Sequence, residues 1–139
     1  MRIFHGTVKS GYRVATANLN PVLRIIESRV GMTGLVEGTL NLQIPEDYVV
    51  IPTSSILPHE YPLNLVSGLN ETIKLQRCVI GGHKAIIMRP DTHERGMFHG
   101  PRQLELIGAV KFRQALRLQD GSVVDVEVEG DDAWWVAAT

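Results

Sequence analysis

The sequence predicts an all-β fold: a small, closed, antiparallel six-stranded barrel with one or two short helices. Many short segments show strand-like alternation, turn residues separate these segments, and only two stretches have helical spacing. This combination is typical of barrels, because a chain with few helices must bury its strands against one another. The 139 residues fit a single domain spanning 1–139.

The first strand is expected at 3–8, and a helix is expected after it. Asn20 can cap the start of this helix, and Pro21 suits the first turn, where no amide hydrogen is needed. Apolar residues follow at helical spacing, and Gly31 can end the helix. The sequence therefore predicts a short helix from Asn20 to Gly31.

The clearest strand pattern lies at 38–44, where apolar and polar residues alternate strictly. Thr39, Asn41 and Gln43 should therefore share one face, with leucine and isoleucine on the other. The proline-rich region 45–62 is expected to be an irregular excursion within the domain.

A hairpin is expected in the second half of the chain. The apolar segments 73–80 and 85–88 flank Gly81-Gly82, which suits a tight turn because glycine tolerates positive φ. Cys78, within the first of these segments, is expected to be a small buried residue.

The last elements follow in quick succession. Segment 103–110 is apolar enough to form a strand, and a second short helix is expected at 112–116. After a turn at 119–122, valines alternate with acidic residues over 123–129, which predicts the strand that closes the barrel.

Charge and composition limit the class of partner. There are 14 basic and 15 acidic side chains, for a net charge of -1, whereas nucleic-acid binding relies on neutralising phosphates. The single cysteine excludes an intramolecular disulfide, and no apolar segment approaches the roughly 18 residues of a membrane helix. We expect a cytoplasmic monomer or small homo-oligomer with no nucleic-acid or membrane partner.

Several common catalytic motifs are missing from the sequence. No glycine-rich stretch leads into Gly-Lys-Ser or Gly-Lys-Thr, and there is no dinucleotide fingerprint or Cys-x-x-Cys pair. Neither His59-Glu60 nor His93-Glu94 is followed by the second histidine of a zinc-protease helix.

Two parts of the chain instead resemble one kinase family. Segment 37–42 contains Gly-Thr-Leu-Asn, and segment 104–113 reads Leu-Glu-Leu-Ile-Gly-Ala-Val-Lys-Phe-Arg, followed at 116–128 by a Leu-x-Leu-x-Asp-Gly-x-x-Val pattern. In this order they resemble the archaeal-type CTP-dependent riboflavin kinases, whose signatures include Gly-Thr-Leu-Asn and Glu-Ile-Ile-Ala-Pro-x-Lys-Leu-Arg. The resemblance implies a cradle-loop, riboflavin-kinase-like barrel.

The resemblance also implies roles for individual residues. Thr39 and Asn41 match the positions that hold Mg²⁺, and their neutral oxygens can complete the shell of a hard cation that also binds phosphate and water. Thr92 and Glu105 would contact the flavin. Glu105 would also act in catalysis, by orienting or deprotonating the acceptor hydroxyl.

The implied nucleotide site joins two distant parts of the chain. It consists of Gly11, Tyr12, Arg13, Val110, Lys111, Phe112 and Arg113. The family usually has a Gly-x-Gly-x-Gly or Gly-x-Gly-x-Ala turn near its N-terminus, but only Gly11 remains here. Lys9 and Arg13 offer side-chain charge in place of backbone amides. Ala109 stands where the family usually has proline.

The implied reaction moves the γ-phosphate of CTP to the 5′-hydroxyl of riboflavin and gives FMN and CDP. The altered N-terminal turn leaves two alternatives: a related kinase with a different donor or acceptor, and a non-catalytic flavin- or nucleotide-binding barrel. Three outcomes would distinguish these hypotheses. Formation of FMN with CTP would indicate the riboflavin kinase, formation only with ATP would indicate a different donor, and flavin binding without transfer would indicate a binding barrel.

Overall fold

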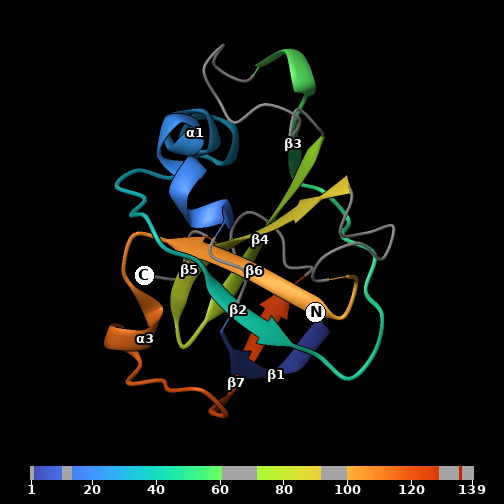
Figure 1. The fold of residues 1–139 in the computed structure, drawn as a ribbon, viewed down its shortest axis with the longest axis vertical. Helices are drawn as coiled ribbons and strands as arrows, with labels where there is room; N and C mark the ends of the chain where they lie inside the picture. The colour runs from blue at the N-terminus through green and yellow to red at the C-terminus, as the bar shows by residue number, and fades with distance from the viewer. Residues whose placement is uncertain (1, 11–13, 61–71, 92–99, 129–134, 136–139) are drawn as a thin grey trace.

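The computed structural model describes residues 2–10, 14–60, 72–91, 100–128 and 135. The described strands are β1 (Arg2–Lys9), β2 (Leu40–Gln43), β3 (Ser54–Ile56), β4 (Ile73–Ile80), β5 (His83–Pro90), β6 (Gln103–Gly108) and β7 (Val123–Val128). The described helices are α1 (Val14–Val30), the 3₁₀ helix η1 (Pro58–Glu60) and α3 (Phe112–Ala115). Figure 1 shows their arrangement.

The sheet closes into an antiparallel barrel. Its strand order is β3-β4-β5-β6-β2-β1-β7, and a further pairing joins β4 to β7. Among the described residues, that closing seam pairs Val79 with Glu127 and Ile80 with Val126. Six strands therefore form the barrel, and β3 extends the sheet beyond β4, which confirms the predicted fold class.

Apolar side chains from all six barrel strands fill the barrel interior. The alternation predicted for β2 and β7 is observed, because Leu40, Leu42, Val126 and Val128 point inward and are buried. Cys78 also lies here and is buried, as expected. Each strand thus has one face fixed by burial, and its other residues face outward.

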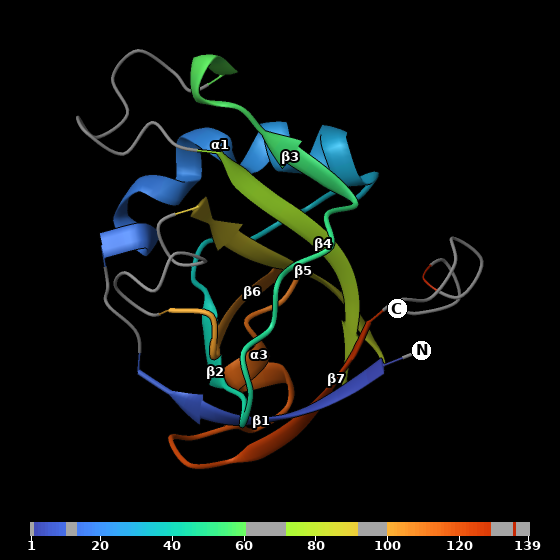
Figure 2. The same cartoon turned by 90° about the vertical axis from the view of Figure 1, so that its right-hand side faces the viewer.

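A second apolar layer, the outer layer, lies between the barrel wall and α1. Val22, Ile26 and Val30 follow at helical spacing along α1 and pack against outward-facing residues of β4, β5 and β6. Figures 1 and 2 show α1 and β3 on one side of the barrel, opposite β1 and β7. Among the described helices, none is long and apolar enough to cross a membrane.

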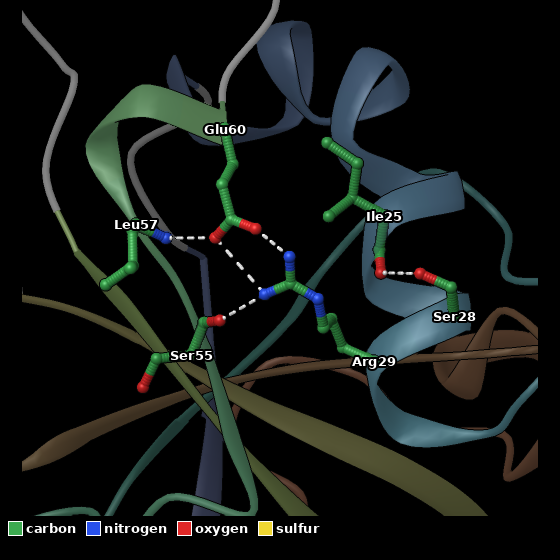
Figure 3. A network of polar contacts seen from close by, with 6 residues as sticks. All are labelled: Ile25, Ser28, Arg29, Ser55, Leu57 and Glu60. Carbon is green, nitrogen blue, oxygen red and sulfur yellow. Dashed lines mark hydrogen bonds and ion pairs between the residues drawn. The ribbon is translucent and has the colours of Figure 1, made fainter.

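An arginine in the last turn of α1 connects the helix to β3 and η1 (Figure 3). Arg29 Nη1 donates to the Ser55 carbonyl over 2.8 Å and to Glu60 Oε2 over 3.1 Å, and Nη2 forms an ion pair with Glu60 Oε1. Glu60 Oε2 also accepts from the Leu57 amide over 2.7 Å. The short strand β3 is therefore held by α1 as well as by β4.

Two sequence-based boundaries need correction. The helix predicted to start at Asn20 begins at Val14, so Asn20 and Pro21 lie inside α1 and do not form its start. The end at Gly31 is correct: Gly31 has φ +73°, and its amide donates to the Glu27 carbonyl over 3.0 Å. Strand β3 lies within region 45–62, where no strand was predicted.

The other predicted turns and helices are observed. Gly81 and Gly82 form the two-residue turn between β4 and β5, with φ values of +56° and +80°. Helix α3 falls within the predicted 112–116, and its Phe112 packs into the barrel interior. A Cβ on Gly108 would come within 2.4 Å of the Phe112 ring, so a glycine is needed there.

Candidate active site

Strand register brings together three polar residues on the outer face of the barrel. Lys9 on β1 pairs with Asn41 on β2, and Asn41 in turn pairs with Glu105 on β6. Because paired residues point to the same face, the three side chains form one row, which we call the polar row. Two strand spacings, about 10 Å, separate its ends.

Asn41 has the features of a cation ligand. It is half-buried, and its Oδ1 atom is buried and accepts no hydrogen bond from any residue in the described ranges. A buried carbonyl oxygen left without a partner costs about 1–3 kcal/mol. A neutral amide oxygen suits a hard divalent cation, so this position fits a metal ligand.

Thr39 lies two positions before Asn41, directly ahead of β2, and is half-buried. The two residues are thus two positions apart at the start of the same strand. Within the described residues, no group of three or more His, Cys, Asp or Glu side chains could hold a metal ion. A cation held by Thr39 and Asn41 would need further oxygen ligands, which phosphate and water can supply.

Glu105 is a buried carboxyl group at one end of the polar row. Only 3% of the residue is exposed, and it lies between Asn41 on β2 and Met88 on β5. Burial raises the pKa of Glu105 to about 7, although the nearby Arg89 guanidinium acts in the opposite direction. A carboxyl group with this pKa can exchange a proton near neutral pH.

Arg89 was not among the residues predicted for the site. It is fully buried, and its Nη atoms donate to the carbonyls of Tyr48 over 2.7 Å and Gln103 over 3.2 Å. Its sequence signal was a charged residue at the end of the apolar segment 85–88. Its charge keeps the pKa of Glu105 from rising further.

The predicted nucleotide residues of segment 110–113 lie beside the polar row, in different environments. Val110 is half-buried against the barrel interior, Lys111 is exposed ahead of α3, and Phe112 is buried in the interior. Arg113 reaches the end of β1, where Nη2 donates to the Lys9 carbonyl over 3.3 Å. This segment therefore meets the polar row at Lys9.

The remaining predicted residues lie outside the described part of the chain. These are Gly11, Tyr12, Arg13 and Thr92. The alignment of Lys9 with Asn41 was not predicted, because sequence alternation assigns a face to each strand but does not give the register between strands.

Comparison with known proteins identifies the family of the chain. The model of the CTP-dependent riboflavin kinase family, described as domain of unknown function DUF120, matches residues 8–128. The chain belongs to this family. The match includes all three residues of the polar row and the whole of segment 110–113.

Several curated relatives of this chain are named riboflavin kinases. A riboflavin kinase of Pyrobaculum arsenaticum is 33% identical over 109 residues, which cover 76% of this chain and 49% of the relative. One from Methanocella arvoryzae is 31% identical over 98 residues, or 66% of this chain and 40% of the relative. One from Pyrobaculum aerophilum is 32% identical over 111 residues, with coverages of 76% and 49%. The chain spans about half the length of these relatives or less.

Proposed function

We propose that this chain transfers the γ-phosphate of CTP to the 5′-hydroxyl of riboflavin and releases FMN and CDP. The observation that carries the proposal is the pairing of Asn41 with Glu105, which sets a candidate metal ligand beside a buried proton acceptor. Family membership and the riboflavin kinase names of the relatives support it. Phosphoryl transfer needs alignment and charge stabilisation above all, and this face offers groups for both.

Thr39 and Asn41 would hold Mg²⁺, and the fit rests on the buried Oδ1 atom of Asn41. When bound, the cation would neutralise charge on the transferring phosphate group. The two side chains would fix its position at the end of β2, next to the acceptor side of the site. Their neutral oxygens leave the net charge of the cation available to the nucleotide.

Glu105 would orient the riboflavin 5′-hydroxyl and accept its proton as the oxygen bonds to phosphorus. Its pKa of about 7 leaves an appreciable ionised fraction at neutral pH and allows later release of the proton. Burial at this position also excludes water, which would otherwise compete with the flavin as acceptor. Thr92 would contact the same substrate.

The nucleotide would bind beside α3 and the end of β1. The exposed Lys111 and the half-buried Val110 would contact it directly, whereas the buried Phe112 would act by fixing the start of α3. Segment 11–13 would complete the site on the phosphate side. The partners implied are riboflavin and FMN on one side of the reaction, and CTP and CDP on the other.

The test is formation of FMN from riboflavin with CTP and Mg²⁺. We expect activity in the wild type, and a loss of about 100-fold or more in Asn41→Ala that is partly relieved by raised Mg²⁺. Gln43→Ala is the matched control, since Gln43 lies on the same strand and face but is exposed. Wild-type activity is expected for that control.

Three outcomes would contradict parts of the proposal. FMN formed only with ATP would change the donor. Flavin binding without transfer under any nucleotide would make the chain a binding barrel. Full activity in Asn41→Ala would remove this residue from the metal site.

A further inference from the structure

Three segments converge at the end of β1, beside the polar row. Arg113 of α3 donates through Nη2 to Asp120 Oδ1 over 2.6 Å and to the Lys9 carbonyl over 3.3 Å. The Ser10 hydroxyl donates to the second oxygen of Asp120, Oδ2, over 3.0 Å. The side chains of Arg113 and Asp120 thus hold Lys9 and Ser10 from two directions, and we call this arrangement the clasp.

Backbone hydrogen bonds fix the same turn to β1. The Val8 amide donates to the Ser122 carbonyl over 2.8 Å, and the Gly121 amide donates to the Val8 carbonyl over 2.9 Å. Gly121 has φ +91°, a conformation that glycine adopts without strain. The turn therefore brings Asp120 to the end of β1 in a defined register, and the clasp forms where β1 leaves the sheet.

The charge of Arg113 is largely compensated within the clasp. The hydrogen bond from Arg113 lowers the pKa of Asp120 most, and the hydrogen bond from Ser10 lowers it further. The carboxylate therefore stays ionised next to the guanidinium. Lys9 differs, since no described residue forms an ion pair with its ammonium group and its side chain is exposed. Among the described residues, Lys9 therefore offers a positive charge without an ion-pair partner, whereas Arg113 is paired with Asp120.

The position of Lys9 makes that charge useful. Its register partner is Asn41, and paired side chains stand about 5 Å apart at Cβ. An ammonium group on a flexible stem can follow phosphate oxygens bound at a neighbouring cation. For this, the end of β1 must stay in register with β2. The clasp restrains the end of β1 in that position.

We propose that Arg113 is a positioning residue that, together with Asp120, fixes the end of β1 so that Lys9 binds the phosphates of the nucleotide beside Asn41. The inference rests on the proposed function, but it assigns Arg113 a role different from the direct nucleotide contact implied by the family resemblance. Arg113 and Asp120 then act as one unit, and Lys9 acts separately.

The test is a double-mutant cycle of Arg113→Met and Asp120→Asn, read as the Kd of CTP with Mg²⁺ by calorimetry and as KM and kcat of FMN formation. We expect each single variant to raise Kd and KM for CTP about tenfold, and the double variant to raise them no further. The kcat should stay within about twofold. Arg113→Lys should restore part of the affinity, because lysine can still pair with Asp120.

Lys9→Met should also weaken CTP binding about tenfold and reduce its salt dependence, since it removes a phosphate contact. Arg2→Met is the matched control at the other end of β1. Its ion pair with Glu46 has side-chain exposures of 39% and 65%, close to the 40% and 62% of the Arg113–Asp120 pair. CTP binding should be unchanged in this variant, and all these exposed variants should fold.

The outcomes separate this inference from the proposed function. Weaker CTP binding in Arg113→Met with unchanged or tighter binding in Asp120→Asn would make Arg113 a direct phosphate ligand and overturn the inference. Unchanged binding in Lys9→Met would also overturn it. If the wild type binds CTP but forms no FMN, the proposed kinase activity is refuted. The double-mutant cycle, read as the Kd of CTP, would still test the clasp. A wild type that binds no CTP would overturn both.

Discussion

Strand β6 faces two different surroundings on its outer side, only two residues apart. Ile107 packs into the outer layer under α1, whereas Glu105 lies in the polar row beside Asn41. Ile107 contributes apolar burial, whereas Glu105 is an ionisable group at a position where burial disfavours its charged form. One strand thus serves folding at one residue and the proposed chemistry at the next outward-facing residue.

The comparison predicts that substitutions in the polar row will lower activity, whereas substitutions in the outer layer will lower stability. The largest effect is expected in Glu105→Gln, which keeps the shape of the side chain but removes the proton acceptor. We expect kcat for FMN formation to fall about 10²- to 10⁴-fold, with KM for CTP changed little. In the wild type, kcat should rise with pH toward a plateau above about pH 7, the pKa of Glu105.

Glu127→Gln on β7 is the control, because its carboxylate lies on an outer face away from β2 and β6. It should retain wild-type kcat and the wild-type pH profile. Wild-type kcat in Glu105→Gln would exclude Glu105 as the catalytic acid–base group.

The second effect concerns the outer layer. Ile26 on α1 is fully buried there, so Ile26→Ala should lower the free energy of unfolding by about 2–5 kcal/mol, measured by urea denaturation. The kcat per folded molecule should change little, since α1 acts through packing. Ser28→Ala, at an exposed position of the same helix, should stay within about 0.5 kcal/mol of the wild type.

A large fall in kcat in folded Ile26→Ala would break the comparison, because it would show that the outer layer and the polar row are coupled.

The smallest effect is a pH dependence of stability. The pKa of Glu105 is raised from 4.5 in the unfolded chain to about 7 in the fold, so between these values the folded state binds one more proton. Its contribution to the free energy of unfolding should therefore fall as pH rises, by at most about 1.4 kcal/mol per pH unit, and level off above pH 7.

Glu105→Gln should lack this slope in urea denaturation between pH 5 and 7, and should be more stable than the wild type at pH 8 by about 1–3 kcal/mol. Equal slopes in the two proteins would show that Glu105 keeps an ordinary pKa.

Much of the fold could be predicted from sequence because its signals are local. Strict alternation in β2 and β7 and the glycine pair after β4 indicate strands and a turn without knowledge of their partners. The two errors have non-local causes. Strand β3 has three residues and is held by β4 and by Arg29, and the tertiary fold overrides the local start signal at Asn20-Pro21.

From sequence, Asn41 and Glu105 could be predicted as candidate site residues, but their arrangement could not. Asn41 and Glu105 belong to strands far apart in the sequence, and only the β2–β6 register places one beside the other. The clasp was missed for the same reason, since Arg113 could be predicted to bind nucleotide but not to pair with Asp120. Sequence gives the face of a residue, whereas contacts between strands depend on the closed barrel.

The single cysteine provides an internal probe of barrel opening. Cys78 is fully buried, burial raises the pKa of its thiol, and the indole of Trp135 donates to its carbonyl over 3.2 Å. An alkylating reagent needs an accessible thiolate, so it can modify this side chain only in molecules whose wall has separated. Labelling rates would therefore report how often the barrel opens around Cys78, without any engineered tag.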